Sequence, residues 1–128
     1  MAIMASLFRL KNNSRGATAV EFAMVLPAFI ALIVGGLYAC LGLFTSASLQ
    51  YAVEKAARCA SVNSTTCSSS ATTIAYAQSA YFGPTAPAAS FTYATGGCGY
   101  TVNGSVNFNF DFGLKNVAVP ISASACFP

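Results

Sequence analysis

The sequence has 128 residues, of which 55% are hydrophobic and only 7% are charged, whereas about a quarter of the residues are charged in an average soluble domain. It contains no histidine and no tryptophan, and its three acidic residues are Glu21, Glu54 and Asp111. This composition argues against histidine-based acid–base catalysis, catalytic triads and most metal sites. We therefore expect a single-domain, non-enzymatic protein that uses no cofactor and no metal.

The net charge of +3 comes from the N-terminus. Arg9, Lys11 and Arg15 lie in the first fifteen residues, and from Ala17 onward the basic and acidic side chains cancel. The chain has no cluster of cations that would displace phosphate counterions, so we expect no nucleic-acid partner. Next to an apolar run, the basic segment instead predicts an N-terminus that stays in the cytoplasm.

An uncharged, apolar run extends from Phe22 to Phe44. As a helix it would measure about 35 Å, which is enough to cross the roughly 30 Å hydrocarbon core of a bilayer. The alternative is a core helix of a soluble protein, but the remaining ~80 residues could not enclose a helix that is apolar on every side. We therefore expect a transmembrane helix in contact with membrane lipid. Pro27 lacks a backbone N–H and should kink or loosen it.

Helix-forming residues continue beyond the apolar run. One face of this continuation is apolar at helical spacing, through Leu49, Val53, Ala56 and Ala60. We expect a single helix over residues 17–61, in which the first half anchors the chain in the membrane. The amphipathic second half would be a stalk on which another element packs.

Glu21 stands at the start of the apolar segment, where a lone carboxylate costs on the order of 3 kcal/mol on insertion scales. One explanation is a helix-start acid that the helix dipole stabilises. The other is cleavage after Gly16, which would create an ammonium on Ala17 and remove the basic leader. In a helical bundle, that ammonium could neutralise Glu21 of a neighbouring chain. At ~4 Å and an effective dielectric near 20, such a pair gains roughly 4 kcal/mol and would offset the burial.

A family resemblance is carried by the segment RGATAVEFAMVLPAFIALIVGGLYA. It closely resembles the N-terminal segment of TadE-like pseudopilins, which are minor pilins of tight-adherence (Tad/Flp) pili. The family pattern is a short basic leader, a glycine, a glutamate at the fifth position after it, then a phenylalanine and an apolar helix with an early proline. Roughly residues 15–40 match this pattern, at Gly16, Glu21, Phe22 and Pro27.

The resemblance implies a minor pilin that a prepilin peptidase cleaves between Gly16 and Ala17, with residues 1–16 as the removed leader. It implies assembly of a type IV pilus of the Tad/Flp class, used for surface adherence. Glu21 and Phe22 would serve recognition and assembly. The implied partners are the peptidase, other Tad/Flp pilins and pseudopilins, and an inner-membrane assembly platform. The protein would cross the inner membrane once, with a periplasmic head that can enter an extracellular pilus.

Residues 62–128 form the expected head. A short helix should be capped by Thr72 or Thr73 and extend through Phe82. Alternating apolar and polar residues predict strands over residues 105–112 and 117–125, and Pro120 gives the second an edge position or a bulge.

A hairpin is predicted at the Asn103-Gly104 pair, with a three-residue loop that places Val102 opposite Val106. We therefore expect an α+β, pilin-like fold: a long N-terminal transmembrane and stalk helix with a small antiparallel sheet of three to four strands. The head aromatics are expected in its core, with adhesion as the alternative, at Tyr76, Tyr81, Phe91 and Tyr93.

The five cysteines fall into two groups. Cys40 lies inside the apolar run and is expected to be a small apolar filler. The other four follow that run, and an even number there predicts disulfides in an oxidising periplasm. Three pairings are possible, and we prefer Cys59–Cys67 with Cys98–Cys126, worth roughly 2.5 and 3.5 kcal/mol by chain entropy. Zinc is the alternative, but neither a Cys-x2-Cys spacing nor a histidine supports it.

Two other functions stay open at this point. Residues 37–40 resemble a lipobox, which would make a lipid-anchored surface protein acylated at Cys40. Tyr38 fits that pattern poorly, and Glu21 would then have no role. The other alternative is a plain single-pass membrane protein that keeps its leader. The three hypotheses differ in the first residue of the native chain, which would be Ala17, a lipidated Cys40 or Met1.

Overall fold

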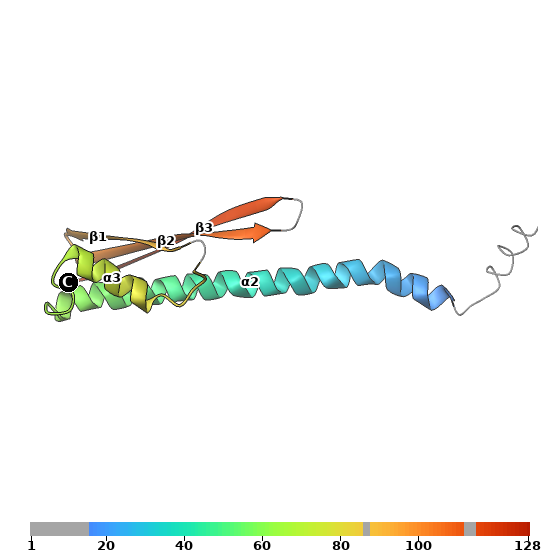
Figure 1. Cartoon of the computed structure of the whole chain (residues 1–128), viewed down its shortest axis with the longest axis horizontal. Coiled ribbons are helices and arrows are strands. Elements are labelled where there is room, and N and C mark those ends of the chain that lie inside the picture. The colour runs from blue at the N-terminus through green and yellow to red at the C-terminus, as the bar shows by residue number, and fades with distance from the viewer. Residues whose placement is uncertain (1–15, 86–87, 112–114) are drawn as a thin grey trace, which may run out of the picture. The chain divides into compact units, whose positions relative to one another are not determined.

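The computed structural model describes residues 16–85, 88–111 and 115–128. The described elements follow one another in the order α2, α3, β1, β2, β3 (Figure 1). The chain divides into two compact units, residues 1–37 and 38–128. A long apolar helix and a three-stranded antiparallel sheet confirm the expected α+β class. The three basic residues of the predicted leader, and Phe112 in a predicted strand, lie outside the described residues.

Helix α2 runs from Ala17 to Val62, 46 residues, and continues through Pro27. Its end lies one residue beyond the expected position, and the kink at Pro27 stays a prediction. In the first unit its large apolar side chains are exposed on all sides, including Phe22 at 66%, Met24 at 76% and Leu32 at 76%. Among the described residues of its own unit, this segment therefore has no hydrophobic core to join.

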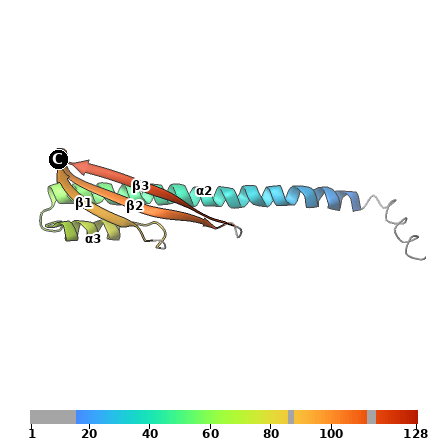
Figure 2. The ribbon, with the colours of Figure 1, turned by 90° about the horizontal axis from the view of Figure 1, so that it is seen from above.

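The second unit has its core between the C-terminal part of α2 and the sheet, which lies along that part of the helix (Figure 2). The predicted apolar face is confirmed: Leu49, Val53 and Ala56 are fully buried and Ala60 is 8% exposed. Partners from the other elements complete this cluster, namely Ala77, Phe91, Val102 and Val106.

Helix α3 spans Ser70–Ala80. Its cap is Ser69 rather than Thr72 or Thr73, so the predicted cap was wrong. The side chain of Ser69 accepts from the backbone N–H of Thr72, and the Thr72 hydroxyl in turn accepts from the N–H of Ser69. Thr72 thus belongs to a capping box as its third helical residue. The helix also ends at Ala80, two residues before the predicted end at Phe82.

The sheet contains β1 (Ser90–Gly96), β2 (Gly99–Asp111) and β3 (Asn116–Phe127), in the order β1-β2-β3 with antiparallel neighbours. The predicted turn at Asn103-Gly104 was wrong, because both residues lie inside β2 and pair with β1 and β3. The hairpin turn instead falls between Gly96 and Gly99, and Gly99 has a φ of 119°. This left-handed conformation is one that glycine adopts at no steric cost.

Gly104 is explained by packing rather than by a turn. A Cβ at this position would lie 2.9 Å from Leu49 Cδ1 and 2.9 Å from Phe91 Cε1, so β2 approaches the helix at the glycine. Strand β3 is an edge strand of the described sheet, as Pro120 predicted, because proline cannot donate to a further strand.

Candidate assembly site

The predicted cleavage bond lies where α2 begins. Gly16 immediately precedes Ala17, the first residue of the helix, and Gly16 is exposed. Apart from its two chain neighbours and the adjacent helix backbone, no described atom lies within 4 Å of the position that a Cβ on Gly16 would occupy. Within the described residues, the bond between Gly16 and Ala17 is therefore not covered by the protein's own packing.

Glu21 lies one turn beyond the start of α2. The first turn of this helix holds no acidic residue, so the carboxylate of Glu21 falls outside the turn in which the helix dipole acts most strongly. Residues four apart share a helix face, which places Glu21 on the same side as Ala17. Glu21 is exposed, and so is Phe22 beside it. The dipole at the start of the helix therefore accounts for little of the cost of this acid, and a partner from a neighbouring chain stays a prediction.

Small residues lie on the same side of α2 as Glu21. Ala28 and Gly35 follow Glu21 at spacings of seven, which is close to two helical turns. A Cβ added at Gly35 would meet no described atom within 4 Å, and the same is true at Gly36. Small side chains allow a second helix to approach closely in a membrane.

The first part of α2 meets the requirements of a membrane-spanning helix. The described residues contain one helix that is long and apolar enough to cross a bilayer, Thr18–Val62. Its most apolar stretch is 0% buried inside the protein. A core helix of a soluble protein would be mostly buried, so this observation disfavours the alternative raised by the sequence.

The four cysteines beyond the apolar run form two disulfides, Cys59–Cys67 and Cys98–Cys126. These are the pairings that the sequence analysis prefers. The first ties the last turn of α2 to the loop before α3, and the second ties the β1–β2 turn to the end of β3. Cys40 is exposed on α2 and outside these disulfides.

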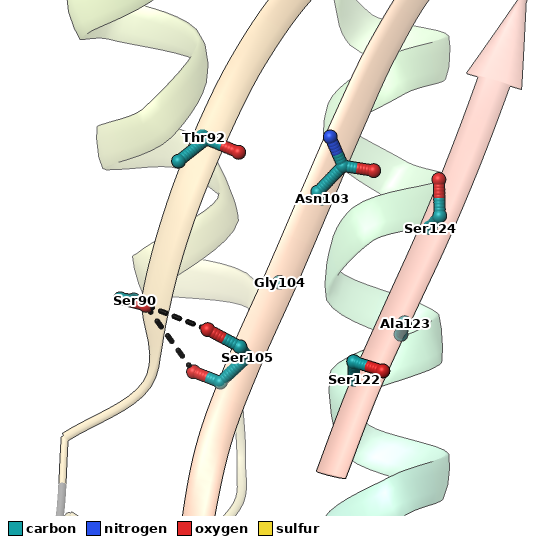
Figure 3. Close-up of a pocket in the computed structure, with 8 residues that line it drawn as sticks. All are labelled: Ser90, Thr92, Asn103, Gly104, Ser105, Ser122, Ala123 and Ser124. Atoms are coloured by element: carbon teal, nitrogen blue, oxygen red, sulfur yellow. Dashed lines mark hydrogen bonds between the residues drawn. The ribbon is translucent and has the colours of Figure 1, made fainter. Parts of the chain in front are cut away.

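The outer face of the sheet carries a concavity of about 400 Å³. Figure 3 shows small polar side chains from all three strands around it. The hydroxyls of Ser90 and Ser105 lie 2.9 Å apart across β1 and β2. No titratable side chain belongs to this lining, which consists of Ser90, Thr92, Asn103, Gly104, Ser105, Ser122, Ala123 and Ser124. It presents hydroxyls and amides without a general acid or base.

A second cavity of about 270 Å³ lies beside Tyr81, Gly83, Pro84 and Phe91. Burial raises the pKa of the Tyr81 hydroxyl, because the charged phenolate is poorly solvated there. The Tyr81 Oη atom is buried and has no hydrogen-bond partner among the described residues. Its ring packs against Phe91 with the ring centres 6.2 Å apart. Tyr81 and Phe91 therefore belong to the packing of the head, as expected for its aromatics.

Two polar residues of the stalk were not identified from the sequence. Thr45 is fully buried, and its hydroxyl donates to the carbonyl of Leu41 at 2.8 Å. The hydroxyl of Ser48 accepts from the backbone N–H of Phe82 at 2.7 Å, which ties the chain after α3 to α2. Both lie on the helical face that continues to Leu49, so extending the apolar pattern backward would have pointed to them.

Comparison with known proteins finds a family match over the first part of the described chain. A protein-family profile described as TadE-like protein matches residues 16–58, about a third of the chain. No curated protein and no solved structure matches the chain. The matched residues begin at Gly16 and include both the exposed and the packed parts of α2. Over residues 16–58 the chain is therefore similar to TadE-like proteins, and this similarity suggests a pilin-like protein associated with the Tad pilus.

Proposed function

We propose that the protein is a non-enzymatic minor pilin, or pseudopilin, that takes part in assembly of a Tad/Flp-type pilus used for surface adherence. Residues 1–16 are a leader that a prepilin peptidase removes, residues 17–61 are anchor and stalk, and residues 62–128 are the head. The N-terminus faces the cytoplasm and the head faces the periplasm. The partners are other Tad/Flp pilins and pseudopilins, and an inner-membrane assembly platform.

One observation carries this proposal: Glu21 is exposed and is the only charged residue in the sequence from Ala17 to Phe44, and the large apolar side chains that follow it on α2 are exposed as well. In hydrocarbon such a group needs a cation or hydrogen-bond donors. From Ala17 to Phe44 the sequence offers no basic side chain. A new ammonium at Ala17 of a neighbouring chain would supply the missing charge once the leader is removed.

The pairing would also set the stagger between neighbouring subunits. An ammonium and a carboxylate in a medium of low dielectric attract strongly only when they are close together, so a neighbour displaced along the helix loses the pair. Ala28 and Gly35 on the same side leave room for the neighbouring helix. Glu21 would thereby fix the axial position of each subunit relative to its neighbour, and Phe22 beside it would add apolar contact.

The first experiment replaces Glu21 by alanine in cells that make the pilus. Glu21→Ala should insert and be cleaved normally, because it changes neither the apolar run nor Gly16, yet it should be lost from filaments or pseudopilin complexes. Glu54→Ala is the matched control, since Glu54 is an exposed glutamate on the stalk part of the same helix. Assembly of Glu21→Ala at the level of the control would contradict the charge-pairing proposal.

The second experiment tests processing. A valine at position 16 adds a branched side chain next to the bond to be cut, so Gly16→Val should accumulate as a precursor that keeps the basic leader. Gly36→Val is the matched control, because it makes the same change within the apolar run. Electrophoresis and intact mass separate precursor from mature chain, and normal cleavage of Gly16→Val would count against a prepilin peptidase.

A further inference from the structure

The sheet extends beyond its first strand as a two-stranded ribbon. β1 pairs only with residues 99–105 of β2, whereas β2 and β3 stay paired as far as Asp111 and Asn116. We call the paired segments Val106–Asp111 and Asn116–Ile121 the arm. Among the described strands, the arm has no third strand at either edge.

The arm is amphipathic. Phe108 lies opposite Val119 and Phe110 lies opposite Val117, so these four apolar side chains share one face. Asn107, Asn109 and Asn116 alternate with them and belong to the other face. Phe108 is 8% exposed, but Val117 and Val119 keep 43% and 41% of their surfaces exposed. Part of the apolar face therefore remains uncovered by the protein.

A ring contact fixes where the arm lies along the helix. The ring centre of Phe110 is 5.5 Å from that of Tyr38, and both residues belong to the second unit. Tyr38 precedes Phe44, the end of the apolar run, by six residues or about 9 Å of helix. The arm therefore lies beside the last turns of a segment that the sequence alone assigns to the membrane.

The arm cannot lie at the same depth in the membrane as the hydrocarbon core of the bilayer. A ribbon with unpaired edges exposes backbone N–H and C=O groups, and each such group costs several kcal/mol in hydrocarbon. Residues 17–37 alone form a helix of about 31 Å, which matches the roughly 30 Å core without the later residues. Tyr38 follows directly, and tyrosine is enriched at the membrane–water interface.

We propose that the apolar end of the arm, at Val117 and Val119, rests in the headgroup region of the outer surface of the inner membrane and sets the depth of α2. The lipid-spanning segment is then residues 17–37 rather than 22–44. Lys115 is exposed at the same end, where Asp111 pairs with Asn116, so this end carries one charge of each sign and the proposed contact is apolar. This inference rests on the proposed membrane anchor. It deepens the pilin proposal, because Glu21 then lies within the hydrocarbon rather than at its edge.

Because the sequence contains no tryptophan, a single introduced tryptophan would be the sole source of tryptophan fluorescence. Single-tryptophan variants of the full chain would be reconstituted at low density in phosphatidylethanolamine–phosphatidylglycerol vesicles with outward-facing heads. Val117→Trp reports on the apolar face of the arm and Asn109→Trp on its polar face. Leu32→Trp, in the middle of the helix, reports on the anchor itself. Lipids brominated near the headgroup or deep in the chain, and aqueous iodide, serve as quenchers.

The proposal predicts blue-shifted emission from Val117→Trp, quenched by shallow bromine and shielded from iodide. Asn109→Trp should be quenched by iodide, and Leu32→Trp by deep bromine. If Leu32→Trp is quenched by deep bromine while Val117→Trp responds only to iodide, the arm stays in water and this inference fails, although the anchor stands. If Leu32→Trp responds only to iodide, the membrane anchor itself fails, and the inference fails with it.

A second copy of the chain is the competing occupant of the arm. Shielding of Val117→Trp by another protein would decrease as the lipid-to-protein ratio is raised, whereas shielding by lipid would not. Loss of shielding on dilution would overturn the proposal in favour of a protein contact. Unchanged shielding across a tenfold dilution, together with quenching by shallow bromine, would support it.

Discussion

The two parts of α2 show what the same helix does in two surroundings. Before Tyr38 its apolar side chains point outward on every side, and Met24 and Leu32 are each 76% exposed. From Thr45 onward one face is buried, and Leu49, Val53 and Ala56 have no exposed surface. The backbone is continuous helix in both parts. The second part therefore finds its apolar partners within the chain, whereas the first has none among the described residues of its own unit.

Removal of the disulfide that closes the sheet should lower the stability of the second unit more than any other change proposed below. Cys98→Ala with Cys126→Ala should lower the free energy of unfolding of the second unit by about 3.5 kcal/mol, because the bridge closes a long loop. Denaturant unfolding in detergent, followed by near-ultraviolet circular dichroism, measures it. Cys40→Ala is the control and should have little effect, since Cys40 is exposed and outside the disulfides. A loss no larger than that of Cys40→Ala would show that the Cys98–Cys126 disulfide does not stabilise the second unit.

Two leucine-to-alanine substitutions compare the buried and the exposed part of the same helix. Leu49→Ala removes a fully buried side chain and should cost about 3 kcal/mol of head stability through lost transfer energy and a cavity. Leu32→Ala makes the same change where the side chain is 76% exposed, and it should leave unfolding of the head unchanged. The same denaturation assay compares them. A comparable loss from Leu32→Ala would show that the first part of α2 also stabilises the head.

Two glycine-to-alanine substitutions should show a smaller difference in stability between the same two parts of the molecule. Gly104→Ala places a Cβ 2.9 Å from Leu49 Cδ1, so the packing must shift at a cost of about 2 kcal/mol. Gly36→Ala meets no described atom within 4 Å, and alanine favours a helix more than glycine does. Thermal unfolding in the same detergent should separate the two variants. Wild-type stability of Gly104→Ala would mean that β2 does not approach α2 as closely as the structure indicates.

The smallest expected effect is pH-dependent and confined to the head. Burial raises the pKa of Tyr81 above its ordinary value of 10.0, so the neutral phenol favours the folded state. This contribution is complete below pH 10 and is lost as the pH rises through the raised pKa. Tyr81→Phe should keep neutral-pH stability, because the hydroxyl has no hydrogen-bond partner in the described part of the chain, and should lose less stability in alkali than wild type. Identical alkaline loss in both proteins would contradict this assignment.

The helix was predictable from the sequence because its signals are local and long. The absence of charge predicted the apolar helix, and the spacing from Leu49 to Ala60 predicted the buried face of the stalk. The proposed site comes from the sequence and stays a prediction, since it rests on Gly16, Glu21 and Phe22, which lie close together in the chain. The predicted start of the helix at Ala17 is confirmed, and it places Glu21 as the fifth helical residue, beyond the first turn.

The strands were harder to predict because glycine occurs both in turns and at positions where the backbone packs closely against another element. Asn103-Gly104 reads locally as a hairpin turn, but Gly104 is needed where β2 meets Leu49, a residue far away in the sequence. The true turn lies in a glycine-rich stretch around Cys98, and strand β1 before it was missed. The cap of α3 failed for a related reason, because a run of serines and threonines offers several similar candidates. Tertiary packing selected among choices that the local sequence leaves nearly equal.

Whether a peptidase removes the leader can be read from the first residue of the native protein. The protein would be extracted from the membranes of cells with an active prepilin peptidase, and its intact mass and N-terminal sequence determined. We predict a chain that begins at Ala17, with its new ammonium available to Glu21 of a neighbouring chain. A native chain that still begins at Met1, or one that begins at a lipidated Cys40, would contradict the account.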